Sequence, residues 1–138
     1  MDPDLISEKL ESLRRCVQRV QKKCPATPEE LMEDPDLQDI ISLNLTRAVQ
    51  LSVDIAVHIL ADLDVKPPDT MGSAFDALMS AQIIKADLAG RLKKAVGFRN
   101  IAIHNYEAID WAIVHSIAVT RLGDFNEFAR IISLRLKA

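Results

Sequence analysis

Three side chains suited to phosphate chemistry lie close together in the segment GFRNIAIHNYEAID, residues 97–110. Arg99 is a permanent cation whose planar fork can hold two phosphate oxygens, and His104 can exchange a proton near neutral pH. Tyr106 is the chain's only tyrosine, and Trp111, its only tryptophan, directly follows the segment. We therefore predict a phosphate-directed site here, with Arg99 and His104 at its centre.

The spacing of Arg99 and His104 restricts how they can act together. Five residues at 100° per residue place them about 140° apart around a regular helix. They can converge only if the backbone is irregular between them or if a second chain completes the site. Gly97 as a helix C-cap and Asn100 as the start of a new turn make a break plausible. Residues 101–103 are expected to anchor the segment in the core.

A purely structural interpretation of the same residues also remains open. Arg99 would then pair with an acid such as Glu107 or Asp110, and His104 would cap the last helix. Tyr106 would be an ordinary half-buried tyrosine whose hydroxyl makes a hydrogen bond.

Charge is segregated along the chain, although the net charge is only −3. The cations of one basic run, which leads into the 97–110 segment, are Lys85, Arg91, Lys93, Lys94 and Arg99. Residues 14–23 form a second basic run, whereas residues 29–39 are acidic. The small negative net charge argues against a general nucleic-acid coat, because nonspecific binding of that kind rests on many phosphate contacts. Charge runs alone are often no more than solvated helix faces.

Helices must position these residues, because four glycines and six prolines supply little turn material for an all-β fold. Apolar residues spaced three and four apart predict a first helix from Ile6 to Val20. Thr27 and Glu30 form a capping-box pattern for a short second helix that begins at Pro28. Residues 36–64 predict a long central helix, and shorter helices are expected within 72–82 and 85–96. A final helix should begin near Glu107 and run toward the C-terminus, with Gly123 as a possible kink.

Together these patterns predict an all-α, up-and-down helical bundle formed by a single domain over residues 1–138. The acidic start lacks the pattern of a signal peptide, and no window has the uninterrupted apolar length of a membrane span. We therefore expect a cytoplasmic protein without a membrane partner. Cys16 and Cys24 are expected to be reduced, and His58 and His115 to be structural. No residue spacing indicates a bound metal, and no cofactor is expected.

The motif RNIAIHNY, residues 99–106, has the form Arg-x4-His-x-Tyr and resembles the HepT-like branch of the HEPN superfamily. The resemblance covers nearly the whole chain. It includes the basic first helix KLESLRRCVQRV, the central LQDIISLNLTRAVQLSVDIAVHIL, the segment FDALMSAQII, and RNIAIHNYEAID. The eight-residue motif is short, but its place in this order of helices makes the similarity specific.

The resemblance implies a metal-independent endoribonuclease that works as a homodimer, with two Arg/His motifs facing each other. Arg99 would hold the scissile phosphate, and His104 would act as general acid or base while the ribose 2′-hydroxyl attacks phosphorus. The products would be a 2′,3′-cyclic phosphate and a 5′-hydroxyl. Asn100 is a weaker candidate for positioning the phosphate or His104. The weaker candidates for contact with RNA are Arg91, Lys93 and Lys94.

The resemblance also implies a partner, an MNT-type nucleotidyltransferase antitoxin of a prokaryotic type VII toxin–antitoxin pair. This partner would silence the toxin by transferring AMP to Tyr106, which should then be exposed beside the RNA groove. An alternative is a noncatalytic helical dimer that binds the nucleotidyltransferase and helps present its substrate. A plain helical adaptor is a third possibility. Trp111 could belong to either the dimer interface or the core.

Overall fold

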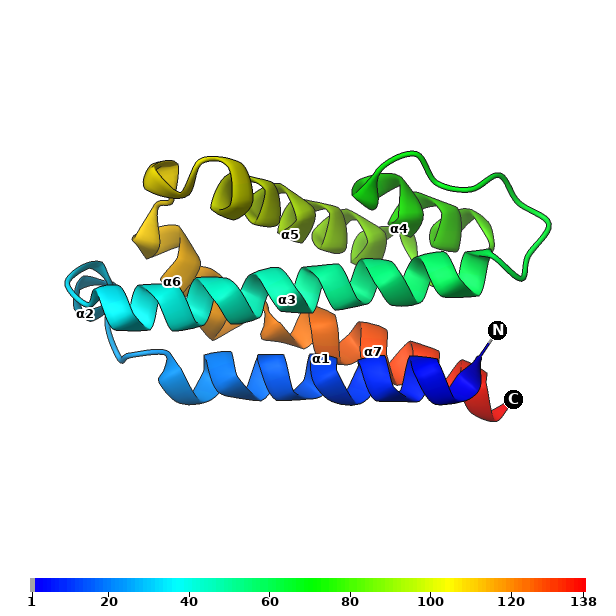
Figure 1. The fold of residues 1–138 in the computed structure, drawn as a ribbon, viewed down its shortest axis with the longest axis horizontal. Helices are drawn as coiled ribbons and strands as arrows, with labels where there is room; N and C mark the ends of the chain where they lie inside the picture. The colour runs from blue at the N-terminus through cyan, green and yellow to red at the C-terminus, as the bar shows by residue number, and fades with distance from the viewer. Residues whose placement is uncertain (1) are drawn as a thin grey trace.

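The computed structural model describes residues 2–138, and all regular structure within them is helical (Figure 1). The long helices, which run up and down along the bundle, are α1 (Pro3–Lys23), α3 (Pro35–Leu60), α5 (Ala86–His104) and α7 (Leu122–Lys137). The shorter elements are α2 (Pro28–Met32), α4 (Met71–Ser80), the 3-10 turn η1 (Tyr106–Ala108) and α6 (Trp111–Thr120). The two ends of the chain lie together at one end of the bundle, while α2 and η1 lie at the other (Figure 1). The predicted all-α, up-and-down bundle is confirmed.

Local sequence signals set the starts of the N-terminal helices. The side chains of Asp2 and Asp34 accept hydrogen bonds from the backbone N–H groups that open α1 and α3, and a proline follows each cap. Thr27 and Glu30 form the predicted capping box at α2, with both reciprocal hydrogen bonds present. Helices α2 and α3 therefore begin at or within one residue of the predicted positions, whereas α1 begins at Pro3, three residues before the predicted Ile6.

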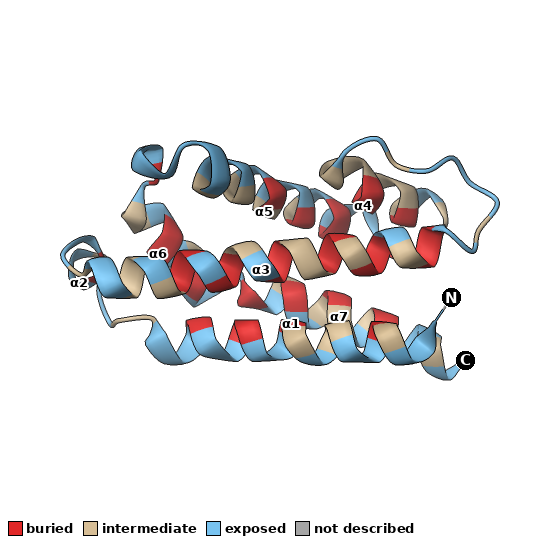
Figure 2. Ribbon diagram, viewed as in Figure 1, coloured by how far each residue is buried: buried red, intermediate tan, exposed pale blue. Residues whose placement is uncertain are grey.

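Helix α3 is the centre of the bundle and packs against α1, α4 and α5 (Figure 2). It ends at Leu60, before the predicted residue 64. By length and composition α3 would also pass as a membrane span, but 56% of its most apolar window is buried inside the protein. The apolar side chains of α3 therefore form part of the hydrophobic core. Phe75 and Phe128 also lie in this core and meet edge to face, with 6.0 Å between their ring centroids.

The second half of the chain departs from the predicted boundaries. Helix α5 does not stop near residue 96 but continues through Gly97 to His104. The final helix does not begin near Glu107, because Asp110 caps α6 at Trp111 instead. The interruption between α6 and α7 lies at Arg121, with φ −117° and ψ 0°, rather than at Gly123. These ends are set by caps and packing, which the apolar pattern does not locate.

Candidate active site

Helix α5 carries both Arg99 and His104 on one unbroken backbone, so the predicted break at Gly97 is wrong. A glycine inside a helix costs only about 1 kcal/mol relative to alanine, which neighbouring helix formers and packing readily offset. The helix ends one residue after His104, where Asn105 leaves helical geometry with φ −151° and ψ 63°. In a regular helix this spacing places Arg99 and His104 about 140° apart around the axis, on different sides of α5.

Arg99 is half-buried and only partly satisfied. Its Nη1 donates a hydrogen bond of 3.3 Å to Oδ1 of Asn100, while its Nε is buried and finds no partner among residues 2–138. A buried donor without a partner costs about 1–3 kcal/mol, and such groups in native proteins call for an explanation. The contact also gives Asn100 a role: it holds one end of the guanidinium. The suggested pairing of Arg99 with Glu107 or Asp110 is not seen.

His104 is exposed at the end of α5 and caps no helix. Its surroundings are exposed as well: Ile101 and Ile103 are 45% and 51% exposed. The prediction that residues 101–103 anchor the segment in the core is therefore wrong for both isoleucines. The reason is that the last buried residue of α5 is Val96, and beyond it the helix passes the edge of the core.

Tyr106 lies in η1, and both its hydroxyl group and its ring contact other residues of the chain. Its hydroxyl donates a hydrogen bond of 2.7 Å to Oδ1 of Asp39 in α3, and its ring packs on Trp111 with centroids 5.7 Å apart. Burial raises the pKa of the phenol; Ser42 lowers it and the Asp39 carboxylate raises it. The residue is still 39% exposed, as predicted for a tyrosine that another protein must reach.

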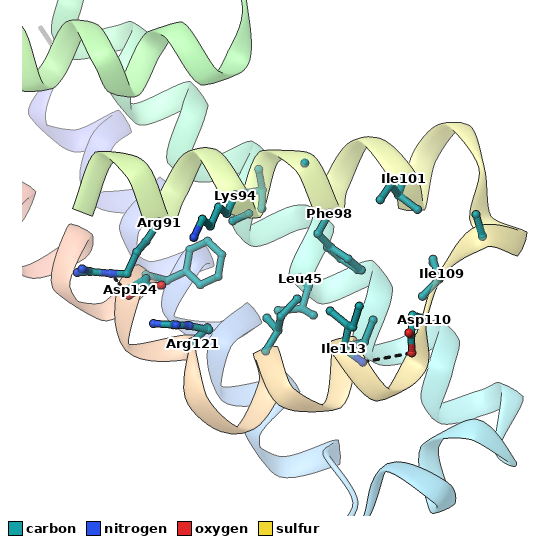
Figure 3. Close-up of a pocket in the computed structure, with 17 residues that line it drawn as sticks. Leu45, Arg91, Lys94, Phe98, Ile101, Ile109, Asp110, Ile113, Arg121 and Asp124 are labelled. Atoms are coloured by element: carbon teal, nitrogen blue, oxygen red, sulfur yellow. Dashed lines mark hydrogen bonds and ion pairs between the residues drawn. The ribbon is translucent and has the colours of Figure 1, made fainter. Parts of the chain in front are cut away.

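An apolar groove of about 490 Å³ lies beside the motif, between α5 and α6, with Leu45 of α3 also lining it (Figure 3). Phe98 and Ile101 line it from α5, and Ile113 faces them from α6. Ile113 is 58% exposed, which is unusual for a large apolar side chain in such a setting. This apolar surface was not predicted from the sequence. Its signal was the helix 111–120 itself, which is apolar on more sides than a single core contact requires.

The basic run before the motif is not uniformly free to bind RNA. Arg91 is held by three carboxylates, those of Asp124 at 2.7 Å, Glu127 at 3.1 Å and Asp87 at 3.2 Å. The hydrogen bond from Arg91 lowers the pKa of the Asp87 carboxyl group. Lys93 pairs with Asp76 at 3.1 Å. Lys94, at the rim of the groove, has no ion pair within residues 2–138 (Figure 3).

The remaining candidate groups have structural surroundings. His115 is buried, and its Nε2 lies 2.8 Å from the backbone oxygen of Pro25, as expected for a structural histidine. His58 is half-buried on α3. Cys16 and Cys24 are free thiols, as predicted. Within the described part of the chain, no three His, Cys, Asp or Glu side chains come together in a way that could hold a metal ion.

Asp39 is the site residue that sequence analysis missed. It belongs to an acidic run that resembled an ordinary solvated face, and it contacts Tyr106 across 67 positions of sequence. No local spacing reports such a contact, because it depends on how α3 and η1 pack.

A second groove, between α1 and α3, is lined by Arg15, Arg19 and Arg47. It lies within the first basic run and the central helix, and the sequence analysis gave it no role.

A helical bundle with Arg-x4-His at the exposed end of a helix fits the class that the motif resembles, the HEPN nucleases. Comparison with known families agrees, because the model of the ribonuclease HepT-like family matches residues 9–132. The chain therefore belongs to this family, and is on that basis an endoribonuclease.

Individual relatives extend the similarity over nearly the full chain. The mRNA nuclease HepT of Shewanella oneidensis is 33% identical over 129 residues, covering 94% of this chain and 96% of the relative. The tRNA nuclease HepT of Aphanizomenon flos-aquae is 28% identical over 110 residues, or 80% of this chain and 75% of the relative. Among solved structures, a tri-AMPylated HEPN toxin of Shewanella oneidensis in complex with its MNT antitoxin is similar with a TM-score of 0.89. That match has 33% identity and covers 97% of this chain and 99% of the toxin.

Proposed function

We propose that this protein is the metal-independent ribonuclease toxin of a type VII HEPN/MNT pair, and that it acts as a homodimer in the cytoplasm. The observation that carries the proposal is the placement of Arg99 and His104 on one straight helix end, about 140° apart. One chain cannot direct both side chains at one phosphate. Two copies related by a twofold axis can, because each supplies the group that the other cannot place.

The apolar groove beside the motif supports this arrangement. Ile101 and Ile113 are exposed on neighbouring elements that flank it, and a second copy would remove both from water. Burial of apolar surface is favourable by about 25 cal/mol per Å². A twofold contact centred there would bring the two 97–106 segments toward each other.

In the proposed reaction the ribose 2′-hydroxyl oxygen forms a bond to the adjacent phosphorus while the bond from phosphorus to the 5′ oxygen breaks. One His104 accepts the 2′-hydroxyl proton, and the partner's His104 donates a proton to the departing 5′ oxygen. Arg99 binds the nonbridging phosphate oxygens, whose negative charge grows in the transition state. The products are a 2′,3′-cyclic phosphate and a 5′-hydroxyl.

Neighbouring residues support these roles. Asn100 orients the Arg99 fork through its 3.3 Å hydrogen bond. Contact with the RNA backbone falls mainly to Lys94, since Lys93 and Arg91 are already paired with acids within the chain.

Tyr106 is the proposed control point, to which an MNT-type nucleotidyltransferase transfers AMP. The solved relative that is tri-AMPylated and bound to an MNT antitoxin supports this partner. Tyr106 lies two residues after His104 in the chain and is partly exposed. Added phosphates there would pair with the cations of the site and occupy the space that RNA needs.

The test is cleavage of total cellular RNA by the purified protein in excess EDTA, after mass spectrometry has shown that no AMP is attached. Wild type should cut and leave cyclic-phosphate ends, whereas His104→Ala should not cut. Gln21→Ala, an exposed change on α1 outside the motif and the apolar groove, is the control and should cut normally. Absence of cutting by the unmodified wild type would favour the noncatalytic presenter instead.

A further inference from the structure

The hydrogen bond between Tyr106 and Asp39 gives the proposed modification site a proton acceptor of its own. The 2.7 Å separation between Oη of Tyr106 and Oδ1 of Asp39 is that of a strong hydrogen bond to a carboxylate. Among residues 2–138, the carboxylate of Asp39 has no recorded ion pair or other hydrogen-bond donor. It is therefore held for this phenol alone.

A phenol must lose its proton when its oxygen becomes bonded to phosphorus. Burial keeps Tyr106 from ionising readily, since it raises the pKa of the phenol. The proton must then leave during the attack, to an acceptor within hydrogen-bond reach. Asp39 is already in that position, and protein kinases use an aspartate for the same purpose toward a substrate hydroxyl.

We propose that Asp39 is the general base of the AMP transfer to Tyr106. The Tyr106 oxygen forms a bond to the α-phosphorus of ATP, pyrophosphate leaves, and the phenol proton passes to Oδ1 of Asp39. The protein being modified thus supplies a catalytic residue of the reaction that silences it. This inference rests on the proposed function, because it requires that Tyr106 is the acceptor of AMP.

The same geometry limits Asp39 to the first transfer. Once AMP is attached, the oxygen of Tyr106 has no proton to donate, and a phosphodiester charge lies next to the carboxylate. Like charges at that distance repel, so the modified side chain should turn away from Asp39. Any further AMP would be added to a hydroxyl group of the first nucleotide, beyond the reach of Asp39. Only the first addition should therefore depend on Asp39.

The decisive variant is Asp39→Asn, which keeps an oxygen to accept the hydrogen bond but removes the base. Wild type, Asp39→Asn and Asp39→Ala would be incubated with the purified MNT-type nucleotidyltransferase partner, ATP and Mg²⁺, and intact masses followed over time. We expect the first addition to slow about 100-fold or more in both variants, within the usual range for general base catalysis. Later additions should proceed at the wild-type rate. Asp36→Asn, the same change on an exposed residue of the same helix, is the matched control.

A chemical rescue separates the base from a merely positioning role. Tyr106 is the only tyrosine, so fluorotyrosine supplied during expression enters at this one position. Ring fluorination lowers the pKa of the phenol, which lets the proton leave without a base. The proposal expects fluorotyrosine to restore most of the first-addition rate in Asp39→Asn. Thermal unfolding of each variant and its RNA cleavage before modification confirm that the fold is intact.

The remaining outcomes decide the matter. If wild type receives no AMP on Tyr106, the proposed control by modification fails, and this inference fails with it. If wild type is modified and Asp39→Asn is modified equally fast, this inference alone is overturned. A slow Asp39→Ala with a normal Asp39→Asn would show that Asp39 only holds the ring in place. A slow Asp39→Asn that fluorotyrosine does not rescue would instead implicate Asp39 in docking the partner.

Discussion

The two halves of helix α5 serve opposite purposes although they share one backbone. In the first half, Leu88 and Leu92 are buried in the core, and Arg91 is held by three carboxylates. In the second half Ile103 and His104 are exposed, and Arg99 keeps a buried nitrogen without a partner. Interactions are completed within the chain in the first half and left open in the second. We therefore expect mutations in the first half to affect mainly stability and mutations in the second half to affect mainly RNA cleavage.

The largest effect is expected from Arg99→Lys, in the open half. Lysine keeps the positive charge but replaces a planar fork with a point charge, so the two-oxygen grip on phosphate is lost. The RNA cleavage rate should fall roughly 100- to 1000-fold, as when one group that stabilises a transition-state oxyanion is removed. Unfolding free energy should change little. Arg130→Lys changes an exposed arginine of α7 that has no ion pair among residues 2–138 and is the control. Equal activity of the two variants would contradict the role of Arg99.

In the first half of α5, Leu92→Ala should lower the free energy of unfolding and leave the rate of RNA cleavage by the folded protein nearly unchanged. Leu92 is 1% exposed, and a buried leucine-to-alanine change costs about 2–5 kcal/mol of unfolding free energy. Urea unfolding followed by circular dichroism measures this loss. Cleavage per folded molecule should remain near that of wild type at low temperature. A loss of less than 1 kcal/mol would show that this half of α5 is less tightly packed than its burial indicates.

Self-association should depend on the second half of α5 and on the neighbouring helix α6. Ile113→Asp places a charge in the apolar groove, where the wild-type side chain is 58% exposed. We expect the dimer to weaken by at least about 2 kcal/mol, roughly 30-fold in its dissociation constant. Analytical ultracentrifugation measures the dissociation constant, and cleavage should fall in proportion to the dimer present. Ser116→Asp, an exposed change on the same helix outside the groove, should have a smaller effect. A full-strength dimer in Ile113→Asp would move the interface elsewhere.

The contrast within α5 also explains what the sequence predicts and what it does not. Caps at Asp2 and Asp34 and the Thr27 capping box are local signals, and the three helices that they open were all predicted, although α1 begins before Ile6 and α3 ends before residue 64. The motif residues were found because Arg-x4-His-x-Tyr is also local. The end of α5 was misplaced, since Gly97 weakens a helix by an amount that packing overrides.

Long-range features of the site were beyond a single sequence. The partner of Tyr106 lies 67 residues away in the chain, and nothing near Asp39 marks it. The exposure of Ile101 was likewise missed, because apolar residues in a helix predict burial without saying whether the same chain or another copy provides it. Both features depend on tertiary packing, which local sequence patterns alone do not determine.

The smallest effect distinguishes two cations of α5: Arg91, which is paired with carboxylates, and Lys94, which has no ion pair within residues 2–138. Arg91→Gln should lower the unfolding free energy only slightly, because partly exposed ion pairs contribute little individually. Its effect on RNA binding should differ from that of Lys94→Gln. RNA affinity is best measured in a His104→Ala background, where the RNA stays intact, as a function of salt concentration. Lys94→Gln should lower the slope of log affinity against log salt by about 1, as expected for one lost phosphate contact. Arg91→Gln should leave that slope unchanged, because the guanidinium already binds carboxylates and has no fork free for phosphate.

Equal slopes for both variants and wild type would mean that RNA does not contact this basic run. The α1–α3 groove with Arg15, Arg19 and Arg47 would then be the next surface to test.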